Sequence, residues 1–166
     1  MPLPIKTMTA AIAAMTLLGA VAFAAQTSTP VPAPSPAPEA AVSKKPHRVV
    51  IQVSEADPAV MNIALNNAEN LTKFYKDRGE IVEIEFVAYG PGLAMMRSDT
   101  SPVKARLARM SKDMTHVTFS GCGTTLAKQS TAENQAIFLL PEAHVVAAGI
   151  GRIVELQELG WTYVRP

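Results

Sequence analysis

The sequence lacks several features that would point to common classes of protein. Its 166 residues include one cysteine, which excludes a disulfide within the chain and argues against a closed structural zinc site. Aromatic residues make up only 5% of the chain, and the formal net charge is +1. Nucleic-acid binding relies on a basic surface and on aromatic stacking platforms, so this composition argues against a nucleic-acid partner.

Common catalytic and cofactor-binding motifs are also missing. The sequence contains no Gly-x-Ser-x-Gly nucleophile elbow and no phosphate-binding P-loop. His47, His116 and His144 do not have the spacing of metal ligands. Gly149 and Gly151 form a Gly-x-Gly pair that is too short for a dinucleotide-binding motif. We therefore expect neither a metal site nor a bound cofactor.

The first 24 residues have the pattern of a secretory signal peptide. Lys6 supplies the positive charge, residues 8–23 form an uncharged apolar run, and Ala22-Phe23-Ala24 is a small-x-small cleavage site. The run is shorter than the roughly 20 apolar residues that a spanning helix needs. We expect a cleaved, periplasmic or secreted protein with no membrane association afterwards. An uncleaved amino-terminal anchor is the alternative.

Residues 25–46 predict a linker. Proline occupies every second position from Pro30 to Pro38, with small residues between. Such a segment favours extended polyproline II and cannot bury a core. The sequence thus predicts a spacer followed by one folded domain over residues 47–166.

Within that domain, predicted strands alternate with predicted helices. Apolar, β-branched runs predict strands, while Asp-Pro and Ser-Pro pairs and helical periodicity predict helices. The helices are expected to start at Asp57-Pro58, at Ser101-Pro102, near Thr124 and at Gly149. The strands are expected at residues 48–53, 81–89, 116–119, 145–148 and 161–164. This alternation predicts an α/β fold with three α/β/α layers and a mostly parallel sheet of about five strands.

Two details of the packing can be predicted. In the first helix, one largely apolar face is expected to pack on the sheet, formed by Val60, Ile63, Ala64, Leu71 and Phe74, with Asn67 as its polar exception. In the second strand, Ile81, Glu83 and Glu85 alternate with apolar residues. That alternation predicts either a wetter end or an edge position in the sheet.

Cys122 lies between Gly121 and Gly123, just after the third predicted strand. In parallel sheets ligands bind at the carboxyl ends of strands, where residues 90–92 also form a glycine-rich turn. A following helix would direct its free N–H groups toward the sulfur, and Thr124 and Thr125 would add hydroxyl donors. Both effects favour the thiolate. The alternative is a buried, unreactive thiol.

The candidate site therefore has one reactive group and several binding groups. Cys122 is the candidate catalytic residue. The candidate binding residues are the neighbouring glycines and threonines, the turn glycines and one helix asparagine: Gly121, Gly123, Thr124, Thr125, Gly90, Gly92 and Asn67.

Four segments, in order, resemble the DsrE/DsrF-like family: ALNNAENL at 64–71, VEIEFVAYGPGL at 82–93, FSGCGTTL at 119–126 and VVAAGIGRIVELQELGWTYVRP at 145–166. The chain would be an exported variant. The resemblance implies a flavodoxin-like domain that assembles into homo-oligomers. It also implies sulfur-relay chemistry, in which Cys122 accepts a sulfane sulfur as a persulfide and hands it on. The protein would then be a sulfurtransferase or sulfur carrier, with a donor or acceptor protein as partner.

Two other functions fit the same residues. One is a non-catalytic oligomeric binding module, since few acid–base groups are expected near Cys122. The other is a redox-sensing thiol that forms an intersubunit disulfide.

Overall fold

The computed structural model describes residues 45–166 of the chain. The predicted signal peptide and nearly all of the predicted linker lie outside these residues. The described part is an alternation of strands and helices that ends at Pro166.

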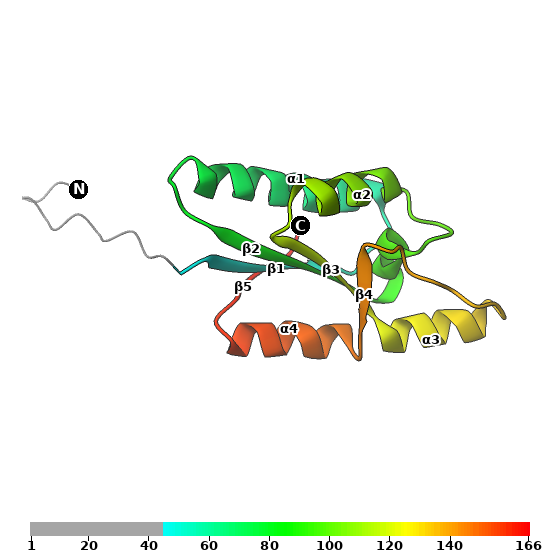
Figure 1. Ribbon diagram of the computed structural model, residues 1–166. Coiled ribbons are helices and arrows are strands. Elements are labelled where there is room, and N and C mark those ends of the chain that lie inside the picture. Colours follow the sequence, from blue (N-terminus) through cyan, green and yellow to red (C-terminus); the bar gives the residue numbers. More distant parts are fainter. Residues whose placement is uncertain (1–44) are drawn as a thin grey trace, which may run out of the picture. The chain divides into compact units, whose positions relative to one another are not determined.

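Five parallel strands form one sheet in the order β4-β3-β2-β1-β5. The strands are β1 (His47–Val53), β2 (Val82–Ala88), β3 (Val117–Cys122), β4 (Ala143–Val146) and β5 (Thr162–Val164). Helices α1 (Pro58–Lys76) and α2 (Lys104–Asp113) cover one face, while α3 (Gly123–Ala132) and α4 (Gly149–Glu158) lie on the other (Figure 1). A 3₁₀ helix, η1 (Gly90–Met96), follows β2. The expected three-layer α/β/α fold, flavodoxin-like in its layering, is confirmed.

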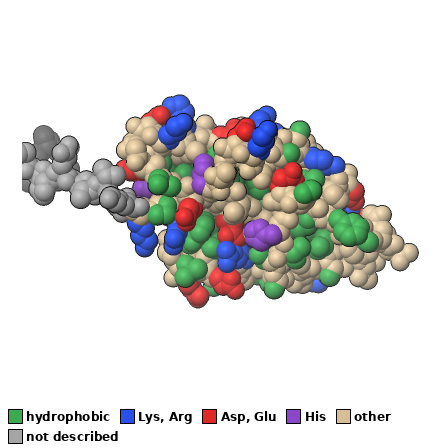
Figure 2. Space-filling model, viewed as in Figure 1, with side chains coloured by type: hydrophobic (Ala, Val, Ile, Leu, Met, Phe, Trp, Pro, Cys, Tyr) green, Lys and Arg blue, Asp and Glu red, His purple; other side chains and the backbone are tan. Residues whose placement is uncertain are grey.

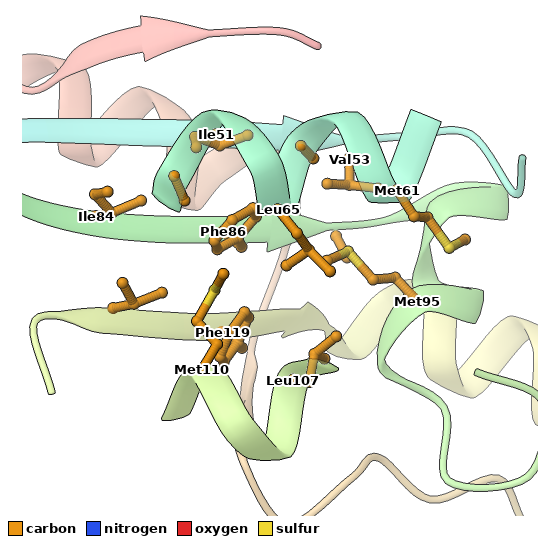
Figure 3. Close-up of a cluster of buried hydrophobic side chains, with 14 of the residues drawn as sticks. Ile51, Val53, Met61, Leu65, Ile84, Phe86, Met95, Leu107, Met110 and Phe119 are labelled. Carbon is orange, nitrogen blue, oxygen red and sulfur yellow. The ribbon is translucent and has the colours of Figure 1, made fainter. Parts of the chain in front are cut away.

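The larger hydrophobic core lies between the sheet and the α1/α2 layer. Because side chains alternate between the faces of a strand, Ile51, Phe86 and Phe119 all point into this core. Figure 3 shows them packed against Leu65 of α1 and Leu107 of α2. A smaller cluster on the other face joins the sheet to α4, and it consists of Val50, Val87, Ile153 and Leu156.

Helix α1 begins where the sequence predicts, but its packed face differs from the prediction. The Asp57 carboxylate caps the helix by accepting the Ala59 N–H at 2.7 Å. The buried residues are Met61, Ala64, Leu65 and Ala68, whereas Ile63 and Phe74 are each 48% exposed. The prediction is right for Ala64 and Leu71, which pack in the core, and wrong for Ile63 and Phe74, because the buried stripe is displaced by about one position. Apolar residues occur on two adjacent stripes of this helix, and contact with the sheet selects between them.

Strand β2 lies between β1 and β3, so the predicted edge position is wrong. The alternative, a wetter end, is confirmed: Ile81, just before the strand, is 64% exposed, and Glu83 is half-buried. Glu85 is charged and buried for another reason. Glu85 is only 3% exposed and forms two hydrogen bonds with Arg152 of α4, from Nε and Nη2 to its two carboxylate oxygens at 2.8 Å each. A buried ion pair thus joins the centre of the sheet to α4.

The surface carries charges of both signs. Figure 2 shows acidic and basic side chains interspersed over the face in view, without a continuous basic area. Among residues 45–166, no helix has the length and apolar character needed to cross a membrane. The same residues contain no group of three or more acidic, histidine or cysteine side chains placed to hold a metal ion.

Candidate functional site

Cys122 lies where neighbouring strands send the chain to opposite faces of the sheet. After β2 the chain continues through η1 to α2, and after β3 it continues directly into α3 (Figure 1). Loops that diverge in this way leave a crevice at the carboxyl edge of a parallel sheet, which is where such folds bind ligands. Cys122 is the last residue of β3, so the strand is longer than the predicted 116–119, which placed Cys122 just after its end.

The sulfur of Cys122 lies at the amino ends of two helices. It caps α3 by accepting the Thr125 N–H at 3.4 Å. It also receives a hydrogen bond from the backbone N–H of Gly149, the first residue of α4. Helix α4 has Ala148 at its N-cap and no side-chain cap of its own. One sulfur atom is therefore the acceptor for free N–H groups of both helices.

This geometry favours the thiolate. Cys122 is 5% exposed, and burial by itself raises the pKa of its thiol. Hydrogen bonds from the Thr125 hydroxyl and from the backbone N–H groups of Gly149, Thr125 and Thr124 oppose that effect, and the pKa ends below its ordinary value. Two helix amino ends, each with a partial positive charge, act in the same direction.

The two threonines have different roles. The Thr125 hydroxyl lowers the pKa of the thiol, as expected. The Thr124 hydroxyl donates instead to the Ala147 carbonyl at 3.0 Å, so the expectation that it serves the thiol is wrong. A hydroxyl has one hydrogen to give, and in Thr124 that hydrogen ties the start of α3 to the segment before α4.

The predicted glycines mark places where elements approach closely. A Cβ on Gly123 would lie 3.1 Å from the Val146 carbonyl oxygen, and one on Gly121 would lie 2.5 Å from a Leu139 methyl group. A Cβ on Gly92 would lie 2.3 Å from the Val53 carbonyl oxygen, so this glycine packs on the end of β1 and does not contact the thiol. Gly90 has φ +54°, and its N–H donates to the Thr125 hydroxyl at 3.0 Å.

Asn67 does not belong to this site. It lies on α1, on the opposite face of the sheet, in a largely apolar groove with Val49, Ile51 and Phe74. The prediction that it lines the site is therefore wrong. The cause is the packing of α1, which directs this part of the helix to the β1–β5 side of the sheet.

A buried polar cluster lies two residues before the thiol. The Ser120 hydroxyl donates to Glu85 at 2.6 Å, which leaves its oxygen to accept from His144 Nε2 at 2.9 Å. In a hydrolase triad the serine gives its hydrogen to histidine, so this arrangement is not a nucleophile pair. His144 lies within β4 and faces Ser120, although the sequence placed it before the strand.

Sequence reasoning missed two side chains behind the site. Gln129 of α3 donates to the Gly90 carbonyl at 3.1 Å, and Arg97 Nη1 donates to Gln129 Oε1 at 3.3 Å. Arg97 is buried and is bound by the carboxylates of Asp99 and Glu133. Apart from the Arg97–Asp99 pair, these contacts join residues more than thirty positions apart, and no local pattern in the sequence indicates them.

Gly149→Ala tests whether α4 contributes to the thiol. The new Cβ would lie 2.9 Å from Tyr89 Cβ and 3.2 Å from Cys122 Cβ, so α4 must move away from the sulfur. We expect a higher thiol pKa, slower alkylation at neutral pH and a loss of about 1–3 kcal/mol in unfolding free energy. The matched control is Gly151→Ala in the same helix, where the nearest atom lies at 3.7 Å. An unchanged alkylation profile in Gly149→Ala would contradict the role of α4.

The fold and site define a parallel α/β/α domain with a helix-capping thiol at the carboxyl edge of its sheet. Comparison with solved structures finds "Protein of Unknown Function MTH1491 from Methanobacterium thermoautotrophicum", with 32% sequence identity and a TM-score of 0.62. The match covers 72% of this chain and 99% of that one. The chain belongs to the same family as MTH1491. No family model and no curated protein matches it.

Proposed function

We propose that this protein is an exported, DsrE-like sulfur carrier in which Cys122 accepts and passes on a sulfane sulfur. The observation that carries the proposal is the Cys122 sulfur, which receives N–H groups from the first residues of α3 and α4. A thiolate is the nucleophile in sulfur transfer, and a thiol with a lowered pKa is also a better leaving group. Both properties are needed by a carrier that first takes up sulfur and then releases it.

The transfer is an exchange between thiolate and persulfide. The Cys122 thiolate attacks the outer sulfur of a donor R–S–SH, a new S–S bond forms at Cys122, and the donor's S–S bond breaks. The electron pair of that bond leaves with the donor as R–S⁻, so Cys122–S–SH is formed without any other oxidant or reductant. An acceptor thiolate attacks the same outer sulfur in the second step and regenerates the Cys122 thiolate.

Burial favours sulfur transfer over the redox-sensing alternative. Cys122 is 5% exposed, and its two neighbouring helix starts enclose the sulfur. A disulfide with a second chain requires the two Cβ atoms to approach within roughly 4.5 Å. A single outer sulfur atom reaches a recessed thiolate more readily than the backbone of another protein does.

The test is persulfide uptake by the full chain. Reduced protein is incubated with a low-molecular-weight persulfide, and its intact mass is measured before and after treatment with a reductant. We expect the mass to increase by one sulfur atom, to return to its original value on reduction, and to stay constant in Cys122→Ser. Absence of the added sulfur on the wild type, or its retention in Cys122→Ser, would exclude the proposal.

A further inference from the structure

Thr125 joins the turn after β2 to the candidate thiolate. Its hydroxyl oxygen accepts the Gly90 N–H at 3.0 Å, and its own backbone N–H donates to the Cys122 sulfur at 3.4 Å. The same hydroxyl also lowers the pKa of the thiol. The Gly90 N–H therefore holds in place the residue that donates to the sulfur.

Gln129 binds the carbonyl group of the same glycine, Gly90. Residues 125 and 129 lie one helical turn apart on α3, so both side chains reach the turn after β2. The Gln129 side-chain N–H donates to the Gly90 carbonyl at 3.1 Å, while the Gly90 N–H binds Thr125. Gly90 has φ +54°, a conformation that favours glycine, and the two contacts fix its orientation from one helix.

The Gln129 amide is itself oriented by a buried arginine. Arg97 Nη1 donates to Gln129 Oε1 at 3.3 Å, which leaves the amide nitrogen of Gln129 to face Gly90. Arg97 has a side chain that is 7% exposed and is bound by Asp99 and Glu133, so its guanidinium is fixed on both sides. A continuous set of contacts thus runs from Arg97 through Gln129 and Gly90 to Thr125.

We propose that Gln129 is a positioning residue for Cys122: held by Arg97, it orients Gly90, and the Gly90 N–H in turn holds Thr125 where its backbone N–H donates to the sulfur. The inference rests on the proposed function in treating Cys122 as the reacting group. It assigns a new role to a side chain that does not contact the sulfur.

The experiment measures the pH dependence of Cys122 alkylation by iodoacetamide in the full chain. Since the chain has one cysteine, the rate reports on this thiol alone. Gln129→Met keeps the length of the side chain and removes its donor. We expect the profile to move to higher pH and the rate at neutral pH to fall by about 3- to 10-fold, the value of one hydrogen bond. Gln157→Met is the matched control, because Gln157 is an exposed glutamine near the end of α4, and its profile should not move.

A double variant separates positioning from a general loss of structure. Thr125→Val should shift the profile in the same direction, and Thr125→Val with Gln129→Met should shift it no further, because both changes break the same link from Gln129 through Gly90 to Thr125. Independent, additive shifts would overturn the inference, as would a Gln129→Met profile identical to that of the wild type. The midpoint of thermal unfolding is measured for each variant, since a purely structural role would lower it without moving the profile.

A second substitution covers the case in which Gln129→Met does not fold. Gln129→Glu keeps an acceptor for Arg97 and has no hydrogen to give to the Gly90 carbonyl at neutral pH, so it should shift the profile in the same direction. An unshifted profile in that variant would overturn the inference. No sulfane sulfur enters this assay. If persulfide uptake failed while Gln129→Met still shifted the alkylation profile, the proposed function would be rejected and the positioning role of Gln129 would stand.

Discussion

Arg152→Met is expected to lower the free energy of unfolding by about 3 kcal/mol at neutral pH, because it leaves the Glu85 carboxylate buried without its partner. Glu85 is 3% exposed, and both of its oxygens bind Arg152 at 2.8 Å. Only Ser120 would remain as a direct hydrogen-bond partner, with His144 beyond it. Chemical denaturation of the full chain at several pH values measures the effect.

The pH dependence of this loss has a defined sign. In the wild type, burial raises the pKa of Glu85, but the hydrogen bonds from Arg152 and Ser120 outweigh it, so the pKa lies below the ordinary value of a glutamate carboxyl. The ion pair therefore contributes stability above that value, and the contribution is lost as the pH falls through the folded-state pKa. Without Arg152, burial should hold the pKa of Glu85 above its ordinary value. The variant's deficit should then shrink on acidification, as the carboxylate becomes protonated.

A double variant provides the control for this prediction. Glu85→Gln with Arg152→Met removes both charges and should recover much of the stability that Arg152→Met loses. If Arg152→Met changed the free energy of unfolding by less than about 0.5 kcal/mol, the usual range for surface substitutions, the ion pair would contribute little. A deficit of constant size from acidic to neutral pH would show that Glu85 is not the group responsible.

Gly92→Ala should destabilise the domain by about 3 kcal/mol, at the upper end of the usual cost of overpacking. The added Cβ would lie 2.3 Å from the carbonyl oxygen of Val53 and 2.8 Å from Ser54 Cα. These are backbone atoms at the end of β1, so rotation of a side chain cannot relieve the contact. The turn after β2 must move, and with it the Gly90 N–H that binds Thr125.

Urea denaturation and iodoacetamide alkylation together test this second prediction. The alkylation profile of folded Gly92→Ala should move to higher pH, in the same direction as that of Gln129→Met. Gly151→Ala again serves as the control. It lies inside α4, where the nearest atom to the new Cβ is at an ordinary contact distance of 3.7 Å, and replacing a helix glycine by alanine should stabilise the domain by about 0.5–1 kcal/mol. If Gly92→Ala matched that control, the close packing of the turn on β1 would be wrong.

Local signals predicted most of the fold. The order of strands and helices follows from β-branched runs, helical periodicity and turn residues, and all five strands occur where a run of this kind was present. Asp57 caps α1 through its carboxylate, as expected from its place before Pro58. These signals act within a few residues of one another, and so they can be read without knowledge of the tertiary structure.

Packing on a particular face could not be predicted in the same way. Helix α1 has apolar residues on two adjacent stripes, and the sheet buries the one with Met61 and Leu65 and leaves Ile63 exposed. Strand β2 has two glutamates and yet lies inside the sheet, because Arg152 reaches Glu85 from α4. In both cases the deciding partner lies far away in the sequence.

The same division applies to the cysteine. The sequence alone determined that the domain has one thiol, that glycines flank it, and that it follows a strand and precedes a helix, because these features are local. Only the tertiary structure decided that a second helix, α4, brings the Gly149 N–H to the sulfur, and that Gln129 and Arg97 support the Gly90 turn behind Thr125. The physical reason is that a parallel sheet gathers the ends of strands that are distant in the chain, and hydrogen bonds across those ends depend on that assembly.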